Sequence, residues 1–283
     1  MTYADSKANA ISKPNARVKI YPDGTQELLV CDRGIFNPEH LERSSKGSSL
    51  AAAPEPEFDE GETVEQSELN ERSVRRAKKA IRDYILCNDF THFVTVTIDP
   101  KQLNRADWGE VIKPLNKWLD NRVQRRALKY LLVPELHSDG ESIHFHGLVN
   151  GAAMRLVDSG TVKVEGLKKP VKMSTYKRHY NGRQYHTVYN IEDWQHGFTT
   201  AIELYGNKAA VAAYVGKYLE KDLTKIGGRI YLHSSNLAKP QVEYFHADFA
   251  EIEGAAFNFN DVNIWWKYQL IEPKSNENVQ KGG

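Results

Sequence analysis

The chain has 283 residues, of which 40% are hydrophobic and 27% are charged, and this suits one globular domain with extensions or two small domains. Lysine and arginine number 38 against 37 aspartates and glutamates, so the net charge of +1 does not by itself indicate a nucleic-acid partner. No apolar run is long enough to span a membrane, and the N-terminus lacks the apolar core of a signal peptide. Cys31 and Cys87 fit no disulfide or zinc spacing. We therefore expect a cytoplasmic protein with no membrane partner.

Residues 1–70 have a composition that is poor in core-forming side chains. Residues 44–49 are small and polar, and residues 55–68 are acidic and contain proline, so we expect a partly disordered N-terminal extension. Within it, two apolar runs flank a Pro-Asp-Gly turn. This pattern predicts a small hairpin at residues 17–31, which is a candidate to pack on the main domain.

Helical and strand patterns alternate through the next part of the chain. The predicted elements are a basic helix at 71–86, a strand at 93–98, an amphipathic helix at 107–126 and strands at 130–136 and 143–150. Pro114 lies early in the amphipathic helix and lacks a backbone N–H, so we expect the true helix to begin near residues 112–113.

The second half of the chain carries a long polar segment and then further short elements. The predicted elements are strands at 198–204, 229–232, 242–249 and 264–270, with a helix at 208–222. Tight hairpins between strands indicate an α+β fold with an antiparallel sheet. We expect the main domain to span 71–250, with a basic insertion at 153–190, and a C-terminal strand and tail at 251–283.

The hairpin expected between residues 130 and 150 predicts a metal site. Asp139-Gly140 is a favoured pair for a two-residue type I′ loop, and that loop places Glu135 opposite His144. His144 and His146 share one face of their strand because side chains alternate. Two imidazoles and a carboxylate suit a divalent cation, Mg²⁺ or Mn²⁺, bound together with a substrate phosphate.

Other interpretations of the histidines stay open. His137 falls on the same face, where it is a competing ligand or supports the ligands from behind. The pair at 144 and 146 also fits a chance pair on a half-buried strand. Metal-dependent hydrolases usually add further Asp and His residues nearby, and residues 147–150 supply none.

The helix predicted at 208–222 carries two tyrosines and two lysines along one stripe: Tyr214, Lys217, Tyr218 and Lys221. A phenol with a pKa near 10 is a poor nucleophile at neutral pH, so it needs a polarised phosphate and a nearby cation. Two nucleophiles can alternate, one holding a 5′ phosphate while the other makes the next cut. The alternative is an ordinary amphipathic helix with aromatic side chains at its edge.

His144-Phe145-His146 followed by Tyr-x-x-Lys-Tyr-x-x-Lys resembles the HUH endonuclease superfamily, and within it the two-tyrosine rolling-circle replication initiators (Rep) of small bacteriophage or plasmid type. Residues 93–99 resemble the first motif of that superfamily, and the three motifs stand in the expected order. The resemblance covers residues 71–240.

The resemblance implies a central antiparallel sheet flanked by helices, with the tyrosine helix packed across the metal-binding strand. It further implies Mg²⁺ or Mn²⁺ dependence, a single-stranded DNA origin as substrate and a 5′-phosphotyrosine intermediate with a free 3′ hydroxyl. His144 and His146 are then the ligands, and Glu135 as third ligand depends on the strand register. The implied nucleophiles and helper cations are Tyr214, Tyr218, Lys217 and Lys221.

A run without acidic residues between Glu165 and Glu192 predicts a surface that holds DNA. Cations there suit phosphates, and interleaved tyrosines suit unstacked bases. The candidate DNA-binding residues are Lys168, Lys169, Lys172, Lys177, Arg178, Arg183, Tyr176 and Tyr180. A solvated surface loop is the alternative. The basic helix at 71–86 is a second candidate surface.

Taken together, these patterns predict a metal-dependent nickase and ligase that starts rolling-circle replication in a bacterial host cytoplasm. No GxxxxGK[ST] loop is present, so we expect a host helicase and polymerase as partners. A plasmid relaxase and a transposase share this chemistry. A non-catalytic origin-binding repressor is the alternative outside the enzymes.

Overall fold

A computed structural model describes residues 14–31, 34–35, 65–205, 211, 226–247, 262–263 and 266–271. The chain divides into two compact units, one made of residues 1–62 and 240–283 and the other of residues 63–239. The part of the N-terminal extension predicted to be disordered lies almost entirely outside the described residues.

The first unit contains a five-stranded sheet with the strand order β11-β1-β2-β13-β12. Its strands are β1 (Ala16–Ile20), β2 (Gln26–Cys31), β11 (Gln241–Phe245), β12 (Val262–Asn263) and β13 (Trp266–Ile271). The hairpin predicted at 17–31 is present as β1 and β2, which pair antiparallel around a turn in which Gly24 has a φ of 84°.

The unit boundaries differ from those expected from the sequence. β11 pairs with β1 and β13 pairs with β2, so both ends of the chain contribute to one sheet. The breaks therefore fall at 62/63 and 239/240, and residues 240–250 belong with the N-terminal hairpin. Pairing between strands far apart in the sequence leaves no local signal that composition could reveal.

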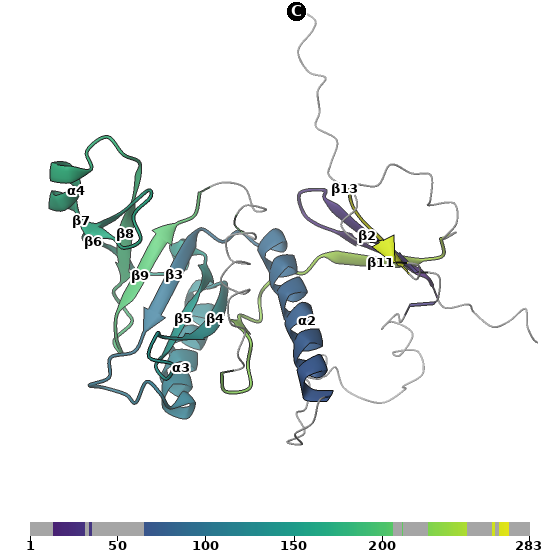
Figure 1. Cartoon of the computed structure of the whole chain (residues 1–283), viewed down its shortest axis with the longest axis horizontal. Coiled ribbons are helices and arrows are strands. Elements are labelled where there is room, and N and C mark those ends of the chain that lie inside the picture. The colour runs from purple at the N-terminus through teal and green to yellow at the C-terminus, as the bar shows by residue number, and fades with distance from the viewer. Residues whose placement is uncertain are drawn as a thin grey trace, which may run out of the picture. The chain divides into compact units, whose positions relative to one another are not determined.

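The second unit contains an eight-stranded sheet with the order β10-β4-β5-β3-β9-β8-β6-β7 (Figure 1). Every described pairing in it is antiparallel. The strands are β3 (His92–Thr97), β4 (Tyr130–Leu136), β5 (Ile143–Val149), β6 (Leu156–Val164), β7 (Val171–Lys172), β8 (Tyr185–Ile191), β9 (Thr199–Glu203) and β10 (Leu232–His233).

The two faces of the central strands bury different sets of side chains. On one face, Phe145 and Val96 pack with buried Leu115 of α3 (Trp108–Arg126). On the other face, Leu148 packs with Ile81 of α2 (Glu65–Cys87). We call these the α3 face and the α2 face, and Figure 1 shows both helices beside the sheet.

Helix α3 begins earlier than Pro114 suggested. Asp107 is the N-cap, and its side chain accepts a hydrogen bond from the Glu110 amide, which satisfies a free donor of the first turn. Pro114 therefore lies inside the helix. Val111 and Leu115, on either side of it, are fully buried, so burial of this apolar stripe outweighs the hydrogen bond that proline cannot make.

The basic insertion is an ordered part of the sheet, where the sequence had suggested a polar segment. β6 and β8 pair along their length, with a register shift between Asp158 and Thr161, and β7 and α4 (Met173–His179) join them. We call residues 156–191 the extension. A small cluster of Val162, Val164 and Tyr176 provides its core.

The predicted α+β fold, with a large antiparallel sheet flanked by helices, is confirmed. The helix predicted at 208–222 lies outside the described residues except for Val211, which is helical. Among the helices that the structure describes, none is long and apolar enough to cross a membrane.

Candidate metal centre

The β4–β5 hairpin has the register that the sequence predicted. Glu135 faces His144, and Val133 faces His146. The turn itself is different, because a bond from the Gly140 amide to the His137 carbonyl closes a β-turn within a four-residue connection. Gly140 has a φ of 76°, whereas Asp139 has no positive φ, so the type I′ loop is wrong. The register is the same because His137 still bonds Ser142 across the strands.

Asp139 organises this turn through its carboxylate. It accepts hydrogen bonds from the amides of Glu141 and Ser142, at 3.0 and 2.9 Å, and from the Ser142 hydroxyl. These bonds hold the pKa of Asp139 well below its ordinary value, and Arg105, 3.5 Å away, acts in the same direction. The carboxylate thus closes the hairpin locally and fixes which residues of β4 and β5 face each other.

Three predicted ligands converge on the α2 face. The Oε2 atom of Glu135 lies 3.6 Å from Nε2 of His144 and 3.4 Å from Nε2 of His146. One ligand atom from each residue lies within 4.8 Å of the others. His144 is buried and His146 half-buried, while Glu135 reaches the surface with a side-chain exposure of 39%. The site therefore opens to solvent on the carboxylate side.

Burial keeps both imidazoles neutral. It lowers the pKa of His144 to about 3 and that of His146 to about 4, and the neighbouring histidines act in the same direction. A neutral imidazole retains the lone pair that a cation needs. His137 lies outside the converging group, but its ring centroid is 4.0 Å from that of His144, so it supports this ligand from the side.

Thr95 orients His146, a role that the sequence analysis missed. Its Oγ1 lies 2.9 Å from Nδ1 of His146, across the β3–β5 pair in which the two residues face each other. With Nδ1 bonded to the hydroxyl, Nε2 points at the site. Phe93 stacks on the same ring at a centroid distance of 5.9 Å. The sequence contained a signal for this role, because polar Thr95 alternates with apolar Val94 and Val96 in a strand with two covered faces.

The donor set fits a divalent cation. Ligand atoms at about 2.1 Å from an octahedral ion lie about 3 Å from one another, so the two separations between the Glu135 carboxylate and the imidazoles need only a small contraction. Two imidazoles and one carboxylate leave further positions for oxygen ligands such as phosphate or water. The structure therefore brings together the three residues predicted as ligands, as a group that could hold a metal ion.

The predicted nucleophiles and their cations lie outside the described residues: Tyr214, Lys217, Tyr218 and Lys221. One described residue bears on them. Val211 is helical and packs against the cluster around Leu148 on the α2 face, the face that carries His144 and His146.

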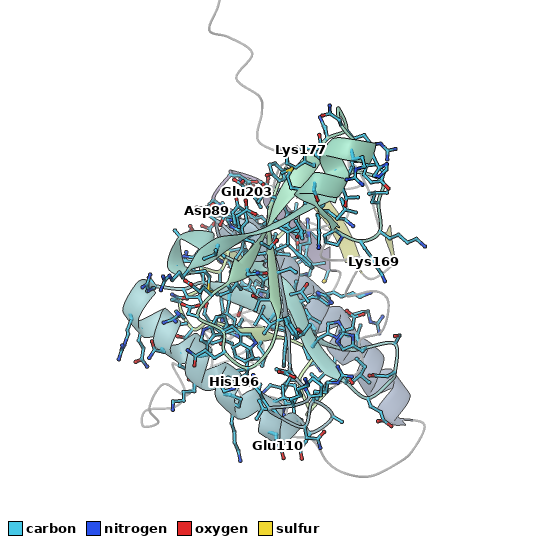
Figure 2. The ribbon with its side chains drawn as sticks, turned by 90° about the vertical axis from the view of Figure 1, so that its left-hand side faces the viewer. Asp89, Glu110, Lys169, Lys177, His196 and Glu203 are labelled. Atoms are coloured by element: carbon cyan, nitrogen blue, oxygen red, sulfur yellow. The ribbon has the colours of Figure 1, made fainter. Side chains whose placement is uncertain are left out.

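The extension presents most of the predicted DNA-binding residues. In Figure 2, Lys177 and Lys169 lie toward the upper right of the view, and His196 lies in its lower part. The exposed cations are Lys168, Lys169, Lys172, Lys177, Arg178 and Arg183. Tyr180 is half-exposed, with the Arg183 guanidinium 5.9 Å from its ring centroid. These side chains are free to approach a phosphate backbone.

Tyr176 does not fit the role predicted for it. It is only 7% exposed, packs with Val162 and Val164, and donates its hydroxyl to the Arg183 carbonyl at 2.9 Å. Its ring is therefore part of the extension's core and is unavailable to a base. The alternating valines of β6 were the sequence signal for a buried face there.

Comparison with known families agrees with the motifs. Residues 91–223 match the family model of the replication-associated protein ORF2, as expected for a rolling-circle Rep-type initiator. The match begins just before β3 and extends in sequence past both candidate tyrosines. Searches of curated proteins and of solved structures gave no match. The family match confirms the predicted resemblance to replication-associated proteins.

Proposed function

We propose that the protein initiates rolling-circle replication by nicking and rejoining single-stranded DNA at an origin through a 5′-phosphotyrosine intermediate. The observation that carries the proposal is the convergence of Glu135, His144 and His146 on one face of the sheet. The match of residues 91–223 to a replication-associated family supports it. So does the packing of Val211, three residues before Tyr214, on that face.

In the proposed reaction the protein aligns a phenol with a phosphodiester. A Mg²⁺ or Mn²⁺ ion held by Glu135, His144 and His146 would polarise the scissile phosphate and help orient it. The phenol oxygen of Tyr214 or Tyr218 forms a bond to phosphorus, and the bond from phosphorus to the 3′ oxygen breaks. The phenol proton leaves, the 3′ oxygen gains a proton, and a free 3′ hydroxyl results.

Lys217 and Lys221 would stabilise the developing negative charge of the phenol. The second tyrosine allows the next cut while the first still holds the 5′ end, and reversal of the step rejoins the strand. Strand separation and primer extension are left to a host helicase and polymerase in the bacterial cytoplasm. A plasmid relaxase or a transposase would use the same residues for the same chemistry.

The test is a denaturing gel of the protein incubated with Mn²⁺ and single-stranded DNA from its replicon. We expect a slower, nuclease-sensitive adduct that disappears with EDTA and in the Tyr214→Phe/Tyr218→Phe double variant. The matched control is Tyr185→Phe, an exposed tyrosine of β8 that should leave the adduct unchanged. DNA binding without any adduct or nick would overturn the enzyme and favour a non-catalytic origin-binding repressor.

A further inference from the structure

Phe198 is an exposed aromatic residue that no part of the proposed reaction uses. Its exposed fraction of 73% is the largest among the exposed large hydrophobic side chains that the structure describes. Single exposed hydrophobic residues are common on proteins and by themselves indicate nothing. Phe198 is different because of where the sheet places it.

The strand register aligns Phe198 with the metal centre. Thr97 of β3 faces His144 of β5, which in turn faces Glu135 of β4. On its other side, the Thr97 amide bonds the Phe198 carbonyl just before β9 begins. Glu135, His144, Thr97 and Phe198 therefore form one row across four neighbouring strands, and two strand spacings, about 10 Å, separate His144 from Phe198.

Side-chain alternation puts Phe198 on the α2 face. Ala201 is buried in the cluster on the α3 face, and Thr199, two residues before it in the same strand, is also buried and shares that face. Phe198 and Thr200 then project to the other side. Thr200 faces Thr95, the residue that orients His146, so the metal centre and Phe198 share this face.

The backbone of Phe198 is held firmly, although its ring is exposed. The amide and the hydroxyl of Thr97 both donate to its carbonyl, each at 2.8 Å. A Cβ on the preceding Gly197 would lie 2.1 Å from the Thr97 carbonyl oxygen, so glycine permits this close approach. The ring thus projects from a fixed point of the sheet, as a preorganised contact does.

We infer that Phe198 is a stacking platform for an unpaired nucleobase that flanks the phosphate bound at Glu135, His144 and His146. A phenyl face stacks on any base, and a distance of about 10 Å suits a nucleotide next to the bound phosphate. This inference rests on the proposed function and narrows its substrate to a strand whose base beside the scissile phosphate is unstacked. The cations of the extension, at the far end of the sheet, would hold a more distant part of the same strand.

The experiment measures binding of a fluorescent oligothymidine of about 16 nucleotides, the upper end of site sizes for one single-strand binding domain, with Mn²⁺ and in the Tyr214→Phe/Tyr218→Phe background so that no cleavage occurs. We expect Phe198→Ala and Phe198→Leu to raise the Kd about fivefold to 150-fold, since leucine keeps apolar area but has no π face. Phe198→Trp should bind at least as tightly as the unchanged protein. Thermal unfolding of each variant checks that the fold is intact.

A second measurement locates the contact directly. The same oligonucleotide carrying 5-iodouracil, irradiated on the protein, should crosslink to a peptide containing Phe198. Phe245→Ala is the control, because Phe245 is also an exposed phenylalanine but belongs to the other unit. Unchanged affinity in Phe198→Ala together with crosslinks that map elsewhere would overturn the inference.

The two proposals fail in different ways. If the adduct forms but binding does not depend on Phe198, the stacking platform is ruled out and the nicking reaction stands. Phe198-dependent binding and crosslinking with no adduct under any metal would leave the platform in place and remove the nicking reaction.

Discussion

The β4–β5 hairpin and the extension belong to the same antiparallel sheet but differ in the burial of their polar side chains. The hairpin covers His144 and His146, so that their partners and orientation are fixed. The extension buries a tyrosine and exposes its cations. A buried site depends on each individual neighbour, whereas an exposed basic surface acts through its summed charge. Single substitutions should therefore disable the hairpin, and only combined ones should affect the extension.

The largest effect is expected from His146→Ala. Removing one of three ligands should lower Mn²⁺ affinity and the rate of adduct formation by more than about a hundredfold, since even the loss of a supporting residue costs up to that much. Calorimetric titration with Mn²⁺ and the denaturing gel measure the two effects. His233→Ala is the control, since His233 is exposed on β10 and lies outside the converging group. Equal Mn²⁺ affinity in both variants would count against the site.

A smaller effect at the same hairpin is expected from Thr95→Val. The substitution keeps the shape of the side chain but removes the oxygen that bonds Nδ1 of His146. We expect Mn²⁺ affinity to fall about tenfold to a hundredfold, as is usual for a residue that orients a ligand. Thr95→Ser keeps the hydroxyl and should restore most of the affinity. If both variants bind Mn²⁺ like the unchanged protein, Thr95 does not position the ligand.

The same two regions show what sequence alone could predict. In the hairpin, period-two alternation and one short connection fix the register, so Glu135 was placed opposite His144 even though the turn type was wrong. In the extension, β6 and β8 pair across twenty intervening residues, and a bulge in β6 interrupts the alternation. Composition there identified the cations, but it could not show that Tyr176 faces inward or that Phe198 lies in line with the metal centre.

The exposed cations of the extension should act as a group. The extension has seven basic residues against two acidic ones. Replacing Lys168, Lys169 and Lys172 together by Gln should reduce the slope of log affinity against log salt by about 2, because each contact with single-stranded DNA contributes about 0.7. Fluorescence anisotropy over a salt series measures this slope.

The matched control removes exposed charges from α3, the helix that packs on the α3 face of the sheet. Lys113, Lys117 and Arg126 are exposed there, and changing them to Gln should leave the salt slope unaltered. An equal loss of slope in both triple variants would mean that binding senses only total charge. The extension would then have no special place in holding the strand.

The smallest effects are expected at Tyr176 in α4 and at Tyr180 just after it, and they should differ in kind. Tyr176→Phe removes the hydrogen bond to the Arg183 carbonyl and should lower the free energy of unfolding by about 1 kcal/mol, with oligothymidine affinity unchanged. Tyr180→Ala should instead weaken binding severalfold and leave stability nearly constant, because its half-exposed ring carries an arginine on its face. Urea denaturation and anisotropy on both variants give the comparison. A buried hydroxyl cannot contact DNA, so it can affect DNA binding only by stabilising the extension. If Tyr176→Phe lost DNA affinity at constant stability, the assignment of Tyr176 to the extension's core would therefore be wrong.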